Sequence, residues 1–323
     1  MKSKSSLLVA YSNKFSEFIT KMRYRNHEEF YRDRYIKYYY VGLIYQYRYL
    51  LKDYVVKNKY KIIKYDGEFG PELKYVIPFA YWHYHNATLR KTISSTHTNE
   101  LYYFSNNHEE YYQKRVWRPY QYGIPNSEDH NIKYNFKQWL PVPYKDKYKN
   151  NIIQFDKPIL IIANKYNIEW GEAPINYIDI DTLIWIFENY SDKYQIIYNR
   201  PVTNNITNDN SDILSFDDFK VIKHDYKKIL NMNELYDGMK NNEIRNYNHF
   251  QLMLYANANH FISVHGGASV LASYFKGMNI IYSIKGFEHY FDEFNNLYPK
   301  LSGARILHAK SNNDIKHFMN RYY

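Results

Sequence analysis

The segment HFISVHGGASVLASYFKGMNIIYS, residues 260–283, constrains the fold more than any other part of this chain. An apolar run is followed by His-Gly-Gly, then by a helical pattern that closes with Gly277, and then by a second apolar run. A strand, a helix and a strand in this order form a parallel βαβ unit, and such strands are apolar throughout because helices cover both faces of the sheet. The segment therefore predicts an α/β fold.

The same alternation runs through the rest of the second half. KPILIIANKY and YQIIYNRP have the pattern of buried strands, and IDTLIWIFENYS lies between them with apolar residues at helical spacing. A loop from Thr203 to Asp212 precedes the helical segment HFQLMLYANA. The stretch 106–150 is polar, contains prolines and has little periodicity, which indicates a domain boundary near residue 150.

The first half contains one clear β–loop–α unit behind a helical N-terminus. A strand is expected at 60–65, then a turn with Gly67, Gly70 and Pro71, then a helix from about Glu72, and NELYYFS has the pattern of a further strand. We therefore divide the chain into an N-terminal helical arm at 1–57, an α/β domain at 58–150 and a Rossmann-like domain at 151–323.

Charge and composition limit the classes of partner. The chain of 323 residues has a formal net charge of +10, which suits anionic partners, but it has no block of five or six like charges typical of a nucleic-acid-binding tail. It has no cysteine, which excludes disulfides and thiolate chemistry and fits a cytoplasmic location. YYYVGLIYQYRYLLKDYVV contains charged residues and is too short to span a bilayer, so we expect an amphipathic helix, and a peripheral membrane contact stays open.

The strand ends of the second half hold the first group of candidate ligands. His265, Gly266 and Gly267 stand where a strand ends and a helix begins, and absent side chains there let a phosphate approach the backbone, with Ser269 adding a hydroxyl. The plain alternative is a tight turn with a helix cap. Lys165 and Arg200 follow two other strands, so both are expected at the same sheet edge, where they would bind a diphosphate unless they are ordinary solvated charges.

Carboxylates form the second group. The loop after the first strand carries Asp66, Glu68 and Glu72, and an acidic loop suits sugar hydroxyls or the removal of a proton from one, unless these residues only cap the helix and line a turn. Asp179 and Asp181 form an Asp-x-Asp triplet, a pattern that holds a divalent metal in one class of sugar transferases. Capping of the helix that follows is a sufficient explanation for the triplet.

DGEFGPELKYVIPFAYWH, LYYFS, NKYNIEWGEAPINYI, IIYNRP and FISVHGGASVLASYFKGMNIIY together resemble glycosyltransferases of GT-B architecture, including viral and bacterial surface-glycan enzymes. The resemblance covers roughly residues 60–310. It implies two Rossmann-like domains, with the acceptor mainly on the first and a nucleotide-sugar on the second. It also implies that the enzyme needs no cofactor and no essential metal. The implied location is the cytoplasm, or the host cytoplasm for a viral protein. The Glu-x7-Glu pattern of many retaining members is absent, so inversion is expected.

The activity that the resemblance implies is transfer of a hexosyl or deoxyhexosyl group to a hydroxyl acceptor. The expected base is Glu68, with Asp66, Glu72 and His265 as rivals. The expected donor-binding residues are Lys165, Arg200, His265, Gly266, Gly267, Ser269 and Glu288. Three other hypotheses stay open: a metal-dependent GT-A enzyme that uses Asp179 and Asp181, a basic nucleic-acid-binding protein, and a glycan-binding protein without catalysis.

Overall fold

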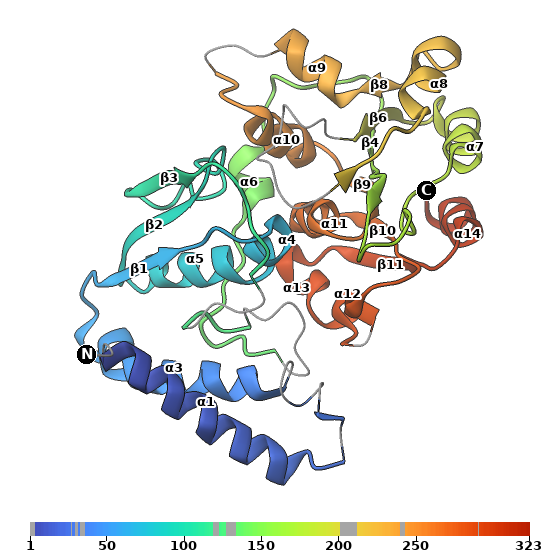
Figure 1. Ribbon diagram of the computed structural model, residues 1–323. Helices are drawn as coiled ribbons and strands as arrows, with labels where there is room; N and C mark the ends of the chain where they lie inside the picture. Colours follow the sequence, from blue (N-terminus) through green and yellow to red (C-terminus); the bar gives the residue numbers. More distant parts are fainter. Residues whose placement is uncertain are drawn as a thin grey trace.

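The computed structural model describes residues 4–26, 28–29, 32, 36–118, 123–126, 134–200, 212–239, 243–289 and 291–323. A pair of N-terminal helices is followed by two parallel sheets and the helices that cover them (Figure 1). The predicted α/β class and the N-terminal helical arm are therefore confirmed. Most of the loop predicted from Thr203 to Asp212 lies outside the described residues, which resume at residue 212.

The arm consists of α1 (Lys4–Arg23) and α3 (Lys37–Leu51), and α3 continues as the π-helical turn η2 (Lys52–Val56). Ser12, Ser16 and Thr20 recur every four residues on α1 and are buried, and Val41 and Gly42 are buried on α3. Small side chains at this spacing let α1 pack against α3, and the two helices lie side by side in Figure 1. Within the described residues, no helix combines the length and the hydropathy needed to cross a bilayer.

The small sheet has the order β1 (Lys61–Lys64), β2 (Leu89–Ser95), β3 (His108–Tyr112), with all strands parallel. Between β1 and β2 the chain forms α4 (Phe69–Pro71), η3 (Glu72–Val76) and α5 (Ile77–His85), close to the predicted helix. The prediction of a strand at NELYYFS is wrong, because this segment is a series of turns. Its apolar residues Leu101, Tyr102 and Phe104 are buried in the core.

The large sheet contains six parallel strands in the order β11 (Arg305–Ala309), β10 (Met278–Tyr282), β9 (His260–Val264), β4 (Ile159–Ala163), β6 (Gln195–Asn199), β8 (Leu230–Asn231). Along the chain, β4 comes first, β6 and β8 extend the sheet to one side, and β9, β10 and β11 then extend it to the other. This is the strand order of the Rossmann fold, and it confirms the predicted Rossmann-like sheet.

Helices cover both faces of the large sheet. The core on one face contains Leu160 and Ile162 of β4 together with residues of α7 (Ile180–Tyr190), α8 (Asp218–Asp225) and α14 (Asn312–Tyr322). The core on the other face contains Ile161 and residues of α10 (Tyr247–Ala256), α11 (Gly267–Ala272), η5 (Ser273–Phe275) and α13 (Tyr298–Ser302). Alternate residues of one buried strand thus belong to two cores, which explains the unbroken apolar runs in the sequence.

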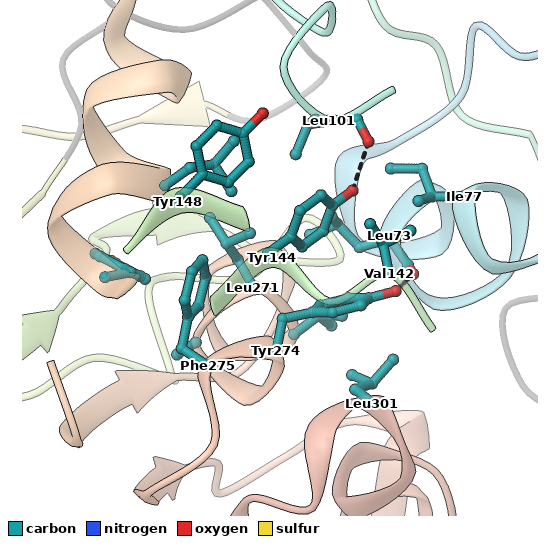
Figure 2. Close-up of a cluster of buried hydrophobic side chains, with 14 of the residues drawn as sticks. Leu73, Ile77, Leu101, Val142, Tyr144, Tyr148, Leu271, Tyr274, Phe275 and Leu301 are labelled. Carbon is teal, nitrogen blue, oxygen red and sulfur yellow. Dashed lines mark hydrogen bonds between the residues drawn. The ribbon is translucent and has the colours of Figure 1, made fainter. Parts of the chain in front are cut away.

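The second of these cores also includes the small sheet's helices. Tyr274 donates a hydrogen bond to the Leu73 carbonyl at 2.7 Å, and Tyr144 of α6 (Tyr144–Tyr148) donates one to the Leu101 carbonyl at 2.8 Å (Figure 2). A buried ion pair of 2.9 Å joins Lys74 to Glu293 of α12 (Glu293–Asn296). The two α/β units therefore share one hydrophobic core, and the boundaries at 57 and 150 stay predictions.

Candidate functional site

The carboxyl ends of β4 and β9 lie side by side at the point where the large sheet reverses its direction of growth. Lys165 follows β4, His265 follows β9, and Ser283 follows β10, so three chain segments bring side chains to this edge. In open α/β sheets, ligands bind in the crevice outside the strand ends at this reversal. The topology therefore selects this edge as the candidate site.

Six side chains gather at this edge, and we call them the His265 cluster: Lys165, Glu169, His265, Ser283, Glu288 and His289. His265 Nδ1 lies 3.1 Å from Ser283 Oγ, and Ser283 Oγ lies 2.8 Å from His289 Nε2. On the other side of the ring, His265 Nε2 lies 3.7 Å from Glu169 Oε1, which also accepts a hydrogen bond from Lys165 Nζ. A chain of polar contacts thus runs through the imidazole.

Glu288 belongs to the cluster through Gly286. A Cβ atom at Gly286 would lie 2.8 Å from Glu288 Oε2 and 3.5 Å from His265 Cε1. The bare glycine therefore leaves room for both side chains, and a donor-binding role for Glu288 stays a prediction.

The His265 imidazole is buried and neutral at physiological pH. Burial, followed by the positive charge of Lys165, lowers its pKa to about 4, although Glu288 and Glu169 act in the opposite direction. Burial and the neighbouring His308 also lower the pKa of His289. A neutral imidazole has one N–H donor and one acceptor nitrogen, so His265 can donate a hydrogen bond to a ligand or accept a proton from one.

The loop after β4 covers the cluster. Its short strand β5 (Asn167–Ile168) pairs with β7 (Asp212–Ile213), and Trp170 then stacks over His265 with ring centroids 6.1 Å apart. Asn176 donates to Glu169 Oε2 at 2.8 Å and accepts from the Ile284 N–H at 2.8 Å, which holds the loop against the segment after β10. About half of the Trp170 surface is exposed, so the loop presents a flat aromatic ring beside the cluster.

The two glycines after β9 serve different purposes. Gly266 has φ of +111°, a conformation that favours glycine, and a Cβ there would lie 3.7 Å from Lys165 Nζ. Gly267 has no such φ, but a Cβ there would lie 2.8 Å from Phe69 Cδ1 and 3.5 Å from the Gly70 nitrogen. The close approach that Gly267 permits is therefore to the Phe69–Gly70 segment, which favours a packing role for this glycine over the predicted approach of a phosphate.

Two other predicted donor ligands have partners inside the protein. Ser269 is buried and donates to the Gly266 carbonyl at 2.9 Å, so its hydroxyl stabilises the turn. Arg200 is buried and donates from Nε and Nη2 to Asp218 at 2.7 and 2.8 Å, and its guanidinium stacks on Phe219 at 4.3 Å. This pairing with a buried carboxylate favours a structural role for Arg200 over the predicted binding of a diphosphate.

The three carboxylates of the acidic loop lie in three environments. Glu72 is fully buried, pairs with Arg115 at 2.7 Å and accepts hydrogen bonds from Tyr102 and Ser94, which favours a structural role over that of a base. Asp66 accepts two hydrogen bonds from Arg118, at 2.9 and 2.6 Å, and this pairing lowers the pKa of Asp66.

Glu68 is half-buried and immediately precedes Phe69, whose ring reaches Gly267. Of the three carboxylate positions, that of Glu68 stands at the contact between the acidic loop and the β9–α11 turn.

The Asp-x-Asp triplet begins α7. Asp179 is the N-cap residue and accepts a hydrogen bond of 2.7 Å from the Thr182 N–H, while its second oxygen accepts one from Asn312. Asp181 lies in the first turn and is exposed. The capping explanation is therefore confirmed for Asp179.

The sequence patterns gave no role to Glu169, Trp170, Ser283 or His289. The one available signal was position, because Ser283 directly follows a predicted strand and so belongs to the same sheet edge as Lys165 and His265.

No protein-family model and no curated protein sequence matches this chain. Among solved structures, it is similar to E. coli ADP-heptose LPS heptosyltransferase II, with a TM-score of 0.49 and 9% identity over 80% of this chain and 97% of the other. It is also similar to the wall teichoic acid polymerase TagF, with a TM-score of 0.32 and 10% identity over 94% and 88%. Both scores lie below 0.5.

Proposed function

We propose that this chain is a glycosyltransferase that moves a sugar from a nucleotide-sugar to a hydroxyl of a glycan or another acceptor. The observation that carries the proposal is the position of Lys165, Glu169 and His265 at the β4–β9 reversal of a sheet with Rossmann strand order. A Rossmann sheet binds nucleotides at this reversal. The three side chains offer a cation, a carboxylate and a neutral imidazole, which suit a diphosphate and sugar hydroxyls.

In this proposal the His265 cluster receives the donor. Lys165 stabilises the negative charge that develops on the departing nucleoside diphosphate, and Glu169 yields its place beside Lys165 to a phosphate oxygen. His265, which is neutral, donates a hydrogen bond to the donor. Trp170 provides a flat apolar surface against which a base or a sugar ring stacks.

The base belongs on the opposite side of the sugar. Inversion at the anomeric carbon requires that the attacking hydroxyl and the leaving group lie on opposite faces of the ring. Glu169 Oε1 contacts Lys165 and lies 3.7 Å from His265. Glu169 and His265 therefore lie beside Lys165, on the side of the leaving group. We therefore assign the base to Glu68, from the loop that meets the β9–α11 turn, and the acceptor to the first α/β unit.

The proposed reaction is metal-independent and inverting, with a hexosyl or deoxyhexosyl donor. Lys165 takes the role that a divalent cation has in metal-dependent transferases. Asp179 supports this assignment because both of its oxygens already accept hydrogen bonds at the start of α7.

A ligand screen tests the proposal. The protein is melted in the presence of a panel of nucleoside diphosphates and nucleotide-sugars, and a ligand at about 100 times its Kd raises the free energy of unfolding by roughly 2.7 kcal/mol. The nucleotide that binds is then titrated calorimetrically into Lys165→Ala, for which we expect affinity to fall by about one to two powers of ten. Lys228→Ala is the matched control, because Lys228 is exposed and precedes β8, at the amino end of that strand and away from the His265 cluster.

Product formation by the wild type and its loss in Glu68→Gln, with nucleotide affinity retained, would support the transferase and its base. Equal nucleotide affinity in the Lys165→Ala and Lys228→Ala proteins would contradict the proposed donor site. Binding of glycan without any turnover would instead identify a glycan-binding protein.

A further inference from the structure

The N-terminal arm exposes an apolar stripe that no other described part of the chain covers. Tyr11, Phe15, Phe18 and Met22 of α1 are 70%, 57%, 59% and 65% exposed. Their spacing of four, three and four residues places all four on one side of the helix. A surface helix of a folded domain normally exposes polar residues and buries its apolar ones. An exposed apolar stripe therefore marks an interaction surface.

A second exposed apolar group lies on the other helix of the arm. It comprises Tyr47, Leu50 and Leu51 at the end of α3, and Tyr54, Val55 and Val56 of η2. Arg48 and Lys52 lie among these residues in the sequence. Large apolar side chains mixed with long basic ones are typical of helices that lie in a membrane interface.

The charge of the arm identifies the chemistry of its partner. Residues 1–57 contain 12 Lys and Arg against 5 Asp and Glu, so the arm carries +7 of the chain's net +10 in under a fifth of its length. On α1, Lys14 and Lys21 each precede a stripe residue by one position, so both flank the same side of the stripe. A second copy of this chain would bring two arms of like charge together, whereas an anionic lipid surface offers both apolar volume and opposite charge.

We propose that the arm docks this protein on the surface of a membrane that contains anionic lipids. The α1 stripe enters the boundary between headgroups and acyl chains, and Lys14 and Lys21 contact the lipid phosphates. Burial of aromatic side chains supplies the apolar part of the binding, and the positive charge makes the binding sensitive to salt and to lipid composition.

Cosedimentation with vesicles tests this proposal with the full chain and without any nucleotide or sugar, so its outcome does not depend on the transferase activity. The probes are vesicles of phosphatidylcholine alone and vesicles that also contain phosphatidylserine. We expect binding only to the second kind, with at least a tenfold loss of partitioning in about 0.5 M NaCl.

Two double variants locate the contact. Phe15→Ser/Phe18→Ser and Lys14→Glu/Lys21→Glu should each lower partitioning at least tenfold, whereas Tyr111→Ser/Trp117→Ser should not, because those exposed aromatics lie outside the arm. The substituted side chains are exposed. Lys21 pairs with Glu17 at 2.7 Å, but an exposed ion pair of this kind typically contributes less than about 1 kcal/mol, so the melting temperature should stay near that of the wild type.

Three outcomes would overturn the proposal. The first is equal partitioning of the Phe15→Ser/Phe18→Ser protein and the wild type. The second is binding that does not depend on phosphatidylserine. The third is a dimer, seen by light scattering without vesicles, that Phe15→Ser/Phe18→Ser dissociates, since the stripe would then be an interface between copies of this chain.

Discussion

The contact between Gly267 and Phe69 gives a quantitative test of why a glycine stands after β9. A Cβ at Gly267 would lie 2.8 Å from Phe69 Cδ1, about 0.6 Å closer than an ordinary carbon–carbon contact. Overpacking of this size typically costs about 1–3 kcal/mol. We therefore expect Gly267→Ala to lower the free energy of unfolding by that amount.

A double-mutant cycle isolates the cause. Phe69→Ala removes the ring that the new methyl group meets, so Gly267→Ala should cost much less in the Phe69→Ala background, with a coupling free energy of at least about 1 kcal/mol. Urea denaturation followed by circular dichroism measures all four proteins. Gly266→Ala is the comparison, because its cost comes from φ of +111° and should not change when Phe69 is truncated.

Two results would refute this reasoning. Costs of Gly267→Ala and Phe69→Ala that add to within about 0.5 kcal/mol would show that the two residues do not compete for space. A fully stable Gly267→Ala protein that has lost nucleotide binding would instead support the predicted phosphate at this position.

Three further predictions concern the candidate site and its surroundings. Arg200→Ala should lower the free energy of unfolding by roughly 3–5 kcal/mol, because it leaves Asp218 buried without its cation. In the fraction of this variant that remains folded, calorimetry should give the nucleotide affinity of the wild type. The His265 pKa falls from 6.5 to about 4 on folding, so the contribution of the neutral ring to stability is present above pH 6.5 and is lost as the pH falls toward about 4. Over this pH range the melting temperature of His265→Gln should fall less steeply than that of the wild type. Equal dependence of the two melting temperatures on pH would contradict the burial argument. Asp179→Ala should cost about 1 kcal/mol and Asp181→Ala much less, with transfer persisting in EDTA; activity lost on chelation and restored by Mn²⁺ would favour the GT-A alternative.

Four of the six strands of the large sheet were predictable because their signals are local, whereas β8 and β11 were missed. The continuous apolar runs at β4, β6, β9 and β10 indicated strands buried on both faces, and the spacing in α7 indicated a helix. Capping by the Asp179–Asp181 triplet was predictable, since a cap contacts the backbone only three residues away, and the structure identifies Asp179 as the cap. In the small sheet, β2 and β3 were missed because their residues alternate weakly, and NELYYFS was misassigned because apolar turn residues are buried by tertiary packing.

The site was only partly predictable for a related reason. The strand-end rule brought Lys165 and His265 to one edge without any knowledge of distances. It also nominated Arg200, and only the fold showed that Asp218, 18 residues further along the chain, holds its guanidinium. No sequence pattern distinguished Glu169 from other carboxylates. Its importance comes from contacts with Lys165, which follows β4, and His265, which follows β9.

The sequence by itself determined the class of fold and the parallel sheet, since the hydrophobic period and the alternation of strands and helices are read locally along the chain. The strand-end rule then selected the candidate edge. Only the tertiary structure decided which side chains at that edge are committed to the protein itself. Gly267 faces Phe69 and Arg200 faces Asp218, whereas Lys165, Glu169 and His265 gather at the β4–β9 reversal. Each of these pairings joins residues whose contact depends on how helices and loops pack over the sheet, and no local pattern records that packing.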